Sequence, residues 1–334
     1  MENQSPVLVA IDDGFRQIKL LSSEQHKLTQ LSVVGPGFTL GGSATVAGDA
    51  GFGAYRTGGR DYTVDPDISN KEGTRYDGYA LSDLNRVLVH HALHTAGLGG
   101  RDVVLATGLP YARYYQGDGE LLEKKIDNLA IAVEAMTGAQ SPRLVAQHVL
   151  PQAVMAYMDY AYDDSLSGFK KGVDPEMPVV VIDVGGGTTD IATVLPNGNA
   201  PKVDRLKSGT INTGVLDTLK ELTARLERRF QFTGVRESLL ERCVRTRKVL
   251  LRGQLHDISD DIAAAVDVAV QPILREMQRL VGSAASETPL LVGGGAALVA
   301  DALRTAYPHM VVAEDPEFAN ARGMLKTLQQ SYAQ

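Results

Sequence analysis

The sequence has little of several features that identify particular classes of protein. It contains one cysteine, Cys243, which excludes an internal disulfide and fits a reducing compartment. No apolar run approaches the roughly 20 residues needed to cross a bilayer. The first residues, MENQSPVLVAIDDG, lack the charged and apolar regions of a secretory signal. We therefore expect a cytoplasmic protein with no membrane association, in which Cys243 is buried and unreactive.

The sequence also lacks an excess of basic residues and the short motifs of several enzyme classes. Its formal net charge is −7, which argues against a surface devoted to nucleic acid or membrane. The GxxxxGK[ST] phosphate loop, the GxSxG elbow, the HExxH zinc motif and paired cysteines are absent. Apolar content of 44% is that of an ordinary globular protein, and 334 residues exceed what one hydrophobic core usually holds. The composition thus predicts two soluble domains.

A repeated pattern is present instead. The stretch VVVIDVGGGTTDI, residues 179–191, reads as a buried strand, a glycine-rich turn and a returning strand. VLVAIDDGFRQIKLL, residues 7–21, has the same plan, with its Asp-x-Gly about half the chain length away. PLLVGGGAALVADAL, from residue 289, is a third strand and glycine turn, here followed by a helix. One Asp-x-Gly is usually only a turn, but the pair and the third unit together predict two similar halves.

Two such hairpin tips can hold a polyphosphate. Glycines let backbone N–H groups approach an anion, and Thr188 and Thr189 add hydroxyl donors. If the tips face each other across a cleft, Asp12 and Asp183 bring like charges together, which is unfavourable unless a cation lies between them. Magnesium fits, because it takes few carboxylates, keeps several waters and bridges phosphate oxygens. Lys19, on the returning strand, is placed to neutralise phosphate charge.

The remaining pattern supplies further elements. Residues 80–96 read as a helix with Ser82 as its N-cap and Gly97 past its end. Within the glycine-rich region 35–64 we expect hairpins, one turning at Gly58-Gly59. Residues 235–251 read as a helix, and residues 260–281 as a long helix interrupted by Pro272. Residues 163–178 read as a surface connection.

The motifs resemble those of the actin-like ATPase superfamily. VAIDDGFRQIK is similar to its first phosphate motif, VIDVGGGTTDI to the second, and LVGGGAALVADAL to the adenosine motif. LPQAVMAY and FANARGML stand where its two connecting helices stand. Within the superfamily, IDDG followed by Lys19, VHHALHTAGL, LPYARYY and YRTGGRDYTVDP resemble the ParM/StbA plasmid-segregation proteins.

The resemblance implies a fold of the α/β class: an actin-like (ribonuclease H-like) duplicated two-domain ATPase with a nucleotide cleft between the domains. Domain I would comprise residues 1–165 plus 320–334, and domain II residues 166–319.

The resemblance also assigns roles. Asp12 and Asp183 would organise Mg²⁺ through its water shell, and Gln152 would orient the attacking water, since a neutral amide aligns water but accepts no proton. ATP would be held by residues of five segments. In chain order these are the first hairpin, the second hairpin, the loop that follows it, the helix expected over residues 235–251, and the adenosine motif. The residues are Asp13, Gly14, Phe15, Arg16 and Lys19; Gly185, Gly186, Gly187, Thr188 and Thr189; Ser208, Gly209 and Gly214; Glu241, Arg242 and Arg245; and Gly293, Gly294, Gly295 and Ala296.

Two residues depart from the family pattern. Phe15 stands where a Ser or Thr normally follows the glycine of the first hairpin, so a hydroxyl contact to phosphate is missing, or Arg16 or the backbone replaces it. Gln152 stands where ParM-like proteins tend to carry Glu, although actin has Gln there. These differences bear on the rate of hydrolysis rather than on the fold.

The function that the resemblance implies is assembly of ATP-dependent filaments that segregate plasmid DNA. Its partners would be other copies of the chain and a small centromere-binding adaptor, with DNA engaged only indirectly. A small-molecule kinase on the same fold is the alternative, although it needs a carboxylate base, and we interpret Asp190 as a hairpin residue. A peptide-binding chaperone would need an appended domain, and a membrane-tethered protein would need a basic amphipathic terminus.

Two clusters allow a second interpretation. His90, His91 and His94 have helical spacing for a metal site, but no further ligand is nearby, and we favour core or capping roles. A basic stretch reads mainly as a solvated helix face, with filament or nucleotide contact as the alternative. It comprises Arg225, Arg228, Arg229, Arg242, Arg245, Arg247 and Lys248.

Overall fold

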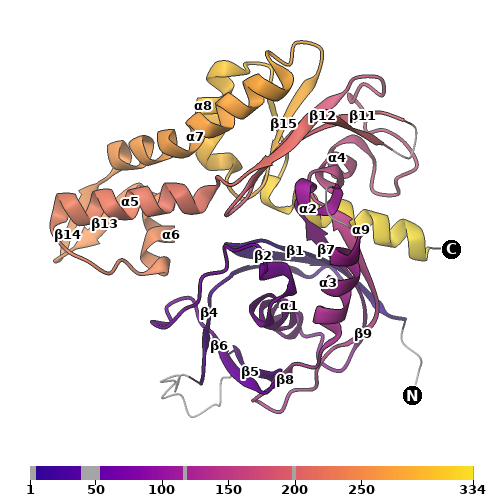
Figure 1. Ribbon diagram of the computed structural model, residues 1–334, viewed down its shortest axis with the longest axis vertical. Helices are drawn as coiled ribbons and strands as arrows, with labels where there is room; N and C mark the ends of the chain where they lie inside the picture. The colour runs from indigo at the N-terminus through magenta and orange to yellow at the C-terminus, as the bar shows by residue number, and fades with distance from the viewer. Residues whose placement is uncertain (1–4, 39–52, 116–118, 198–200, 334) are drawn as a thin grey trace.

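A computed structural model describes residues 5–38, 53–115, 119–197 and 201–333. The chain forms two lobes, each built on a five-stranded sheet. In Figure 1 the N-terminal lobe lies below and the C-terminal lobe above, and α4 and α9 lie between them at the right.

The two sheets have the same plan. In each, three antiparallel strands are followed by two parallel ones, so the sheets have the orders β3-β2-β1-β7-β9 and β12-β11-β10-β15-β16. The predicted duplication is therefore confirmed, and the two glycine turns join β1 to β2 and β10 to β11. The strands are β1 Val7–Asp13, β2 Gln17–Ser22, β3 Lys27–Leu31, β7 Asp102–Leu109 and β9 Arg143–Pro151; and β10 Val179–Val184, β11 Thr189–Leu195, β12 Lys202–Ile211, β15 Thr288–Val292 and β16 Val311–Val312.

In the N-terminal lobe, α1 and a second, smaller sheet cover one face of the main sheet. A small sheet of order β4-β6-β5-β8 packs with α1 around one hydrophobic core. The predicted hairpin turns at Gly58 and Gly59, both with positive φ, and Ser82 caps α1 by accepting a hydrogen bond from the backbone N–H of Asn85 at 3.2 Å. Residues 39–52 of the glycine-rich region lie outside the described part of the chain. The elements are β4 Val34–Pro36, β5 Gly53–Thr57, β6 Arg60–Val64, β8 Glu134–Ala135, α1 Asp83–Thr95, α2 Tyr111–Tyr115, α3 Glu120–Ala130 and a 3-10 turn Tyr79–Leu81.

The C-terminal lobe carries a helical arm, seen at the left of Figure 1. Two predictions are wrong here. The helix expected over 235–251 ends at Thr246, and Lys248 begins a two-stranded hairpin. The helix with Pro272 is continuous, because buried residues on both sides of the proline, such as Ala269 and Ile273, hold it against the core. The elements are α5 Val215–Phe230, α6 Glu237–Thr246, β13 Lys248–Leu251, β14 Gln254–Asp257, α7 Ser259–Val281, α8 Ala296–Ala306 and a 3-10 turn Pro316–Phe318.

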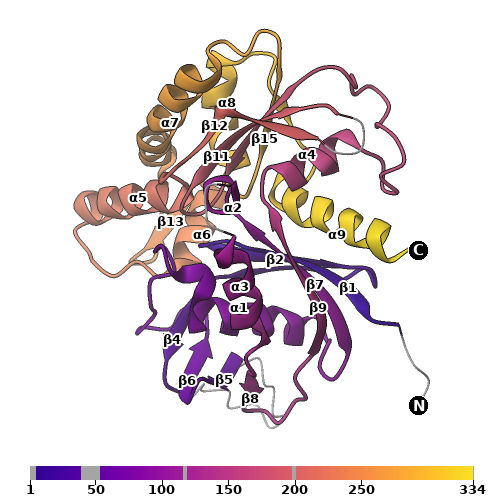
Figure 2. The ribbon, with the colours of Figure 1, turned by 45° about the vertical axis from the view of Figure 1, so that its right-hand side comes forward.

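Helices α4 (Val154–Ala161) and α9 (Ala319–Tyr332) join the lobes. They lie side by side in both ribbon views (Figures 1 and 2) and fill a hydrophobic core that takes apolar side chains from both sheets. The helices approach so closely at Gly323 that a Cβ there would overlap the backbone carbonyl of Met155. Among the described residues, no helix has both the length and the apolar character of a membrane span.

Candidate functional site

A cavity of about 560 Å³ opens between the lobes at the tips of the two hairpins. Residues from both lobes line it, including most of the residues predicted to hold phosphate. The predicted site residues in the lining are Asp12, Asp13, Gly14, Phe15, Arg16, Lys19, Gln152, Asp183, Gly185, Gly186, Thr188, Gly293 and Gly294. The hairpin tips therefore face one space, as their sequences predict.

Asp12 and Gln152 form one polar pair in this cavity. Asp12 is the penultimate residue of β1, and Gln152 directly follows β9, the second strand along in the same sheet. The Gln152 Nε2 donates a hydrogen bond of 2.6 Å to Oδ1 of Asp12. Gly108 makes room for this side chain, because a Cβ there would lie 2.7 Å from Cγ of Gln152. The bond uses the amide nitrogen, so the amide oxygen of Gln152, a residue of the cavity lining, is left as a hydrogen-bond acceptor.

Asp183 is the counterpart of Asp12 in the second lobe. It accepts a hydrogen bond of 2.7 Å from Nδ2 of Asn320 at the start of α9, and Oδ1 of Asn320 accepts one of 3.0 Å from the backbone N–H of Ala153. Burial raises the pKa of Asp183 to about 6, and the negative charge of Asp12 adds to the shift. Asn320 was not predicted, since only the folded chain brings α9 to the end of β10.

Asp190, which the sequence analysis interprets only as a hairpin residue, also belongs to the site. It lies directly opposite Asp183 on the paired strands β10 and β11 and lines the cavity. The Thr210 hydroxyl donates to it, and that hydroxyl also accepts from the backbone N–H of Ala112 in the other lobe at 3.2 Å. Burial raises the pKa of Asp190 to about 7.

The buried carboxylates fit a divalent cation held through water. Burial raises the pKa of Asp12 as well, and Lys19, its partner across β1 and β2, opposes this shift. Asp12 and Asp183 each use one oxygen for an amide, which leaves the other oxygen to receive water hydrogens. No group of three or more His, Cys, Asp or Glu in the described residues could hold a metal directly. Magnesium matches this donor set, because it retains several waters.

The glycines of the second hairpin and the adenosine motif serve close packing as well as access. A Cβ at Gly186 would lie 2.5 Å from Cβ of Arg16, and one at Gly187 would lie 2.7 Å from the Phe15 ring. A Cβ at Gly293 would overlap the Asp183 carboxylate, whereas one at Gly294 would lie 3.4 Å from Nζ of Lys19. Of these two glycines of the adenosine motif, Gly294 is thus the one that lies beside the Lys19 ammonium group in the cavity.

The remaining predicted residues lie outside the lining. The Thr189 hydroxyl donates to the backbone oxygen of Thr213 at 2.8 Å, and that of Ser208 to the oxygen of Asp204 at 2.6 Å, so both serve the fold. Glu241 contacts the cavity through Arg16. The residues outside are Gly187, Thr189, Ser208, Gly209, Gly214, Glu241, Arg242, Arg245, Gly295 and Ala296. Arg242 and Arg245 are exposed, and their contact with purine stays a prediction.

Asp13 is held as a structural anchor of the first hairpin. Its Oδ2 accepts hydrogen bonds of 2.7 Å from both Nζ of Lys125 and Nδ2 of Asn85, and Lys125 also donates to the backbone oxygen of Gly108. Lys125 and Asp13 are both buried, so this ion pair fixes the hairpin base to α1 and α3.

The other candidates have structural explanations. His90 contacts the backbone oxygen of Leu129 at 3.1 Å, and His91 contacts the Tyr55 hydroxyl at 2.8 Å. Burial lowers the pKa of both rings to about 4, so they are neutral at pH 7. Cys243 is buried and free, and burial raises its pKa.

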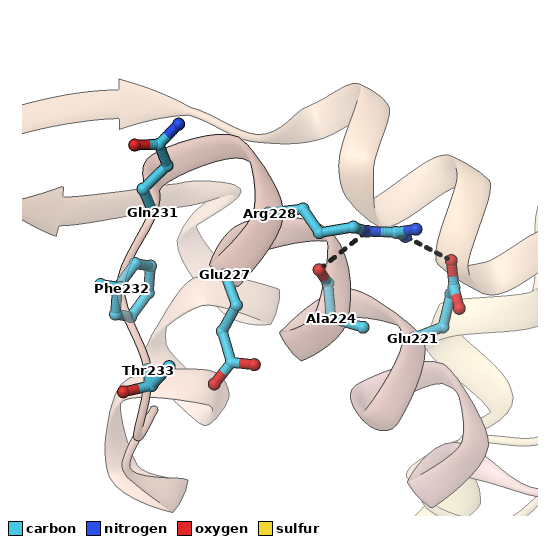
Figure 3. Close-up of a pocket in the computed structure, with 7 residues that line it drawn as sticks. All are labelled: Glu221, Ala224, Glu227, Arg228, Gln231, Phe232 and Thr233. Carbon is cyan, nitrogen blue, oxygen red and sulfur yellow. Dashed lines mark hydrogen bonds and ion pairs between the residues drawn. The ribbon is translucent and has the colours of Figure 1, made fainter.

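A second depression lies on the outside of α5. Figure 3 shows its lining, which includes Glu227 and Phe232, with the Arg228 guanidinium lying between the Ala224 carbonyl and Glu221. It contains none of the predicted site residues, so the cavity between the lobes is the candidate site.

Comparisons with known proteins agree with this architecture. The family model for the N-terminal part of the plasmid segregation protein ParM matches residues 7–162, and that for the C-terminal part of the archaeal actin homologue MreB-like matches residues 181–305. No curated protein sequence matches the chain significantly.

Solved structures share the fold at low identity. A 15-stranded ParM filament from Clostridium botulinum has a TM-score of 0.78 and 19% identity, covering 98% of this chain and 100% of that one. The archaeal actin homologue Ta0583 in complex with ADP has a TM-score of 0.74 and 17% identity, covering 97% and 99%. Bacillus thuringiensis ParM with ATP has a TM-score of 0.68 and 15% identity, covering 98% and 100%. With the duplicated sheets and the shared cavity, these matches show that the chain has the two-domain actin-like fold, and its N-terminal part matches the ParM family model.

Proposed function

We propose that the protein binds and hydrolyses ATP in the cavity between its lobes and uses this cycle to assemble into filaments. The observation that carries the proposal is the pair of matched hairpins, whose buried Asp12 and Asp183 face the same cavity as Gln152. Solved neighbours with ADP and with ATP support nucleotide as the ligand. We also propose that residues 1–165 and 320–334 form one domain and residues 166–319 the other, with the nucleotide between them.

The side chains support hydrolysis by positioning rather than by proton abstraction. The Gln152 amide is neutral and held by Asp12, so it can align a water but cannot deprotonate it. Lys19, Gly14, Gly186 and the Thr188 hydroxyl would bind the phosphates. A magnesium ion held through water by Asp12 and Asp183 would neutralise charge on the phosphate oxygens.

The proposed use of the cycle is segregation of plasmid DNA in the cytoplasm. The ParM filament neighbour and the ParM N-terminal family model support self-association. A head-to-tail contact that does not close generates an open filament. A centromere-binding adaptor would link the filament to plasmid DNA, because an acidic chain of net charge −7 is poorly suited to bind duplex DNA itself.

Sedimentation with different nucleotides tests this proposal. With Mg²⁺ and ATP the protein should pellet, with a slowly hydrolysed analogue the pellet should persist, and with ADP the protein should stay in the supernatant. Gln152→Ala should pellet with ATP and disassemble more slowly than the wild type, by about 100-fold or more if water alignment is lost. A wild-type protein that binds ATP but stays in the supernatant at every concentration would contradict filament assembly.

A small-molecule kinase remains the second candidate, and Asp190 is the observation that favours it. Its carboxylate lies in the cavity, and its pKa of about 7 is suited to accepting a proton from a substrate hydroxyl. Phosphate release from ATP without an acceptor distinguishes the two functions. A kinase would release little phosphate until an acceptor is added, whereas the proposed filament protein needs none.

A further inference from the structure

Arg16 occupies the point where the two hairpin tips meet. It follows Phe15 in the turn between β1 and β2, lines the cavity and is 9% exposed. A Cβ on Gly186 of the opposite tip would lie 2.5 Å from the Arg16 Cβ and 2.8 Å from its backbone nitrogen. The base of this side chain therefore stands beside both glycine-rich turns.

The guanidinium of Arg16 is only partly satisfied. It forms an ion pair across the cleft with Glu241 on α6, whose side chain is 32% exposed. The Nε of Arg16 is buried and has no hydrogen-bond partner. A guanidinium has five N–H donors, so one carboxylate at the rim leaves donors free inside the cavity.

Two other cations lining the cavity, Lys125 and Arg75, hold more fixed partners. Lys125 is buried between Asp13 and the Gly108 carbonyl. Arg75 bonds both the Asp217 carboxylate at 2.8 Å and the Asn212 carbonyl at 2.6 Å. Among the described residues of the lining, Arg16 is therefore the arginine with a buried N–H donor that has no hydrogen-bond partner. Its carboxylate partner, Glu241, is partly exposed and can be hydrated when the ion pair breaks.

We propose that Arg16 is a phosphate-binding residue that exchanges Glu241 for the terminal phosphate of a bound nucleoside triphosphate. This inference rests on the proposed function. A partly exposed ion pair contributes little to stability, so giving up Glu241 costs little. A guanidinium binds phosphate with two parallel charge-assisted hydrogen bonds, which are stronger. Arg16 thereby supplies the contact that the Phe15 side chain, which has no hydroxyl, does not make.

Two variants distinguish phosphate binding by Arg16 from a purely structural ion pair between the lobes. One removes the Arg16 side chain, and the other removes the charge of Glu241. In the exchange model, Glu241 competes with phosphate for Arg16. Arg16→Ala therefore removes a phosphate ligand, whereas Glu241→Gln frees Arg16 to bind phosphate. If the pair only holds the lobes together, both variants break the same bond and must act in the same direction.

The experiment is calorimetric titration with Mg²⁺ and either ADP or a slowly hydrolysed ATP analogue, below the concentration at which the protein assembles. Arg16→Ala should lower affinity for the analogue about tenfold more than affinity for ADP, as expected for losing a hydrogen bond to a charged group. Glu241→Gln should raise the affinity for the analogue relative to that for ADP, because the carboxylate charge that competes for Arg16 is removed. Arg75→Ala, which breaks a similar bridge to Asp217, is the control and should affect both nucleotides alike.

Equal losses for Arg16→Ala and Glu241→Gln with both nucleotides would overturn the inference, and so would an Arg16→Ala variant that binds the analogue normally. If Arg16→Ala does not fold, Arg16→Lys keeps the charge without the planar fork and should still lose affinity selectively for the analogue. Normal analogue binding by that variant would likewise overturn the inference. A wild-type protein that binds neither nucleotide would instead contradict the proposed function itself.

Discussion

Two aspartates in the cavity are held under conditions that disfavour their charge. Asp183 and Asp190 face each other across β10 and β11, and burial raises their pKa values to about 6 and about 7. At neutral pH, ionisation of these carboxyls therefore places negative charge in the cavity at the expense of fold stability. The cation that we propose between Asp12 and Asp183 would offset this cost, which would tie the electrostatics of these residues to ligand occupancy.

The raised pKa of Asp190 should make the free energy of unfolding depend on pH. The unfolded chain loses the Asp190 proton near pH 4, whereas the folded chain keeps it to about pH 7. The folded state binds more protons in that window, so its stability falls as pH rises from about 4 to 7 and then levels off. Asp190→Asn should remove part of that slope and raise the free energy of unfolding at pH 8 by on the order of 1 to 3 kcal/mol.

Urea unfolding without nucleotide at pH 5 and pH 8 provides the measurement. Asp163→Asn is the matched control, because hydrogen bonds from Ser167 lower the pKa of this partly exposed carboxyl and its titration lies below the window. An Asp190→Asn variant with the same pH slope as the wild type would show that the Asp190 carboxyl titrates normally.

At the residue scale, the sequence predicts the parts of the site that sit on local motifs. Asp12, Asp183 and Lys19 follow from the hairpin pattern, and the structure brings them to one cavity. Strand pairing also predicts the position of Asp190. Residues directly opposite on paired strands share a face, so Asp190 lies on the same face as Asp183, whereas the neighbouring Thr189 points to the other face. Asn320 had no such signal, because its contact with Asp183 depends on how α9 packs.

Among the secondary-structure elements, α4 and α9 have the strongest influence on how the lobes are joined. Asn320 and Ala153, at the first turns of these helices, connect directly to Asp183 and Gln152. Farther along, Lys326 of α9 lies 3.1 Å from the Asp159 carboxylate of α4 in a largely buried ion pair. A change in how the helices cross would therefore move groups on both sides of the cavity.

Gly323→Ala tests the crossing of these helices. Alanine normally stabilises a helix relative to glycine, but here its Cβ would overlap the Met155 carbonyl. We expect the free energy of unfolding to fall by about 1 to 3 kcal/mol, as for other overpacked sites. Ser331→Ala, at an exposed position of the same helix, should change it by less than about 0.5 kcal/mol. Urea unfolding compares the two, and a neutral Gly323→Ala would mean that the helices can separate freely.

Elements with strong local signals are predictable, and those decided by packing are less so. The Gly58-Gly59 turn and the Ser82 cap follow directly from residue chemistry. Pro272 is a helix breaker by propensity, yet tertiary contacts keep α7 intact through it. The start of β13 after Thr246 was missed because LLERCVRTRKVLL has helical spacing, whereas Val249 is buried as part of a hairpin.

At the scale of the whole molecule, the duplication places one cavity between two similar sheets. Ion pairs cross this cavity, among them Arg75–Asp217, and both hairpin tips meet there. A ligand that contacts both tips would therefore favour one relative position of the lobes. Such a link between occupancy and shape is what an assembly controlled by nucleotide requires.

The rate of ATP hydrolysis as a function of protein concentration tests the central claim most directly. If hydrolysis is coupled to assembly, phosphate release per molecule should be very low in dilute protein and rise above a critical concentration, where light scattering also begins. Asp183→Ala should show neither rise. Phosphate release per molecule that is constant across concentrations, without scattering, would contradict the account and indicate a hydrolase or kinase that works as single molecules.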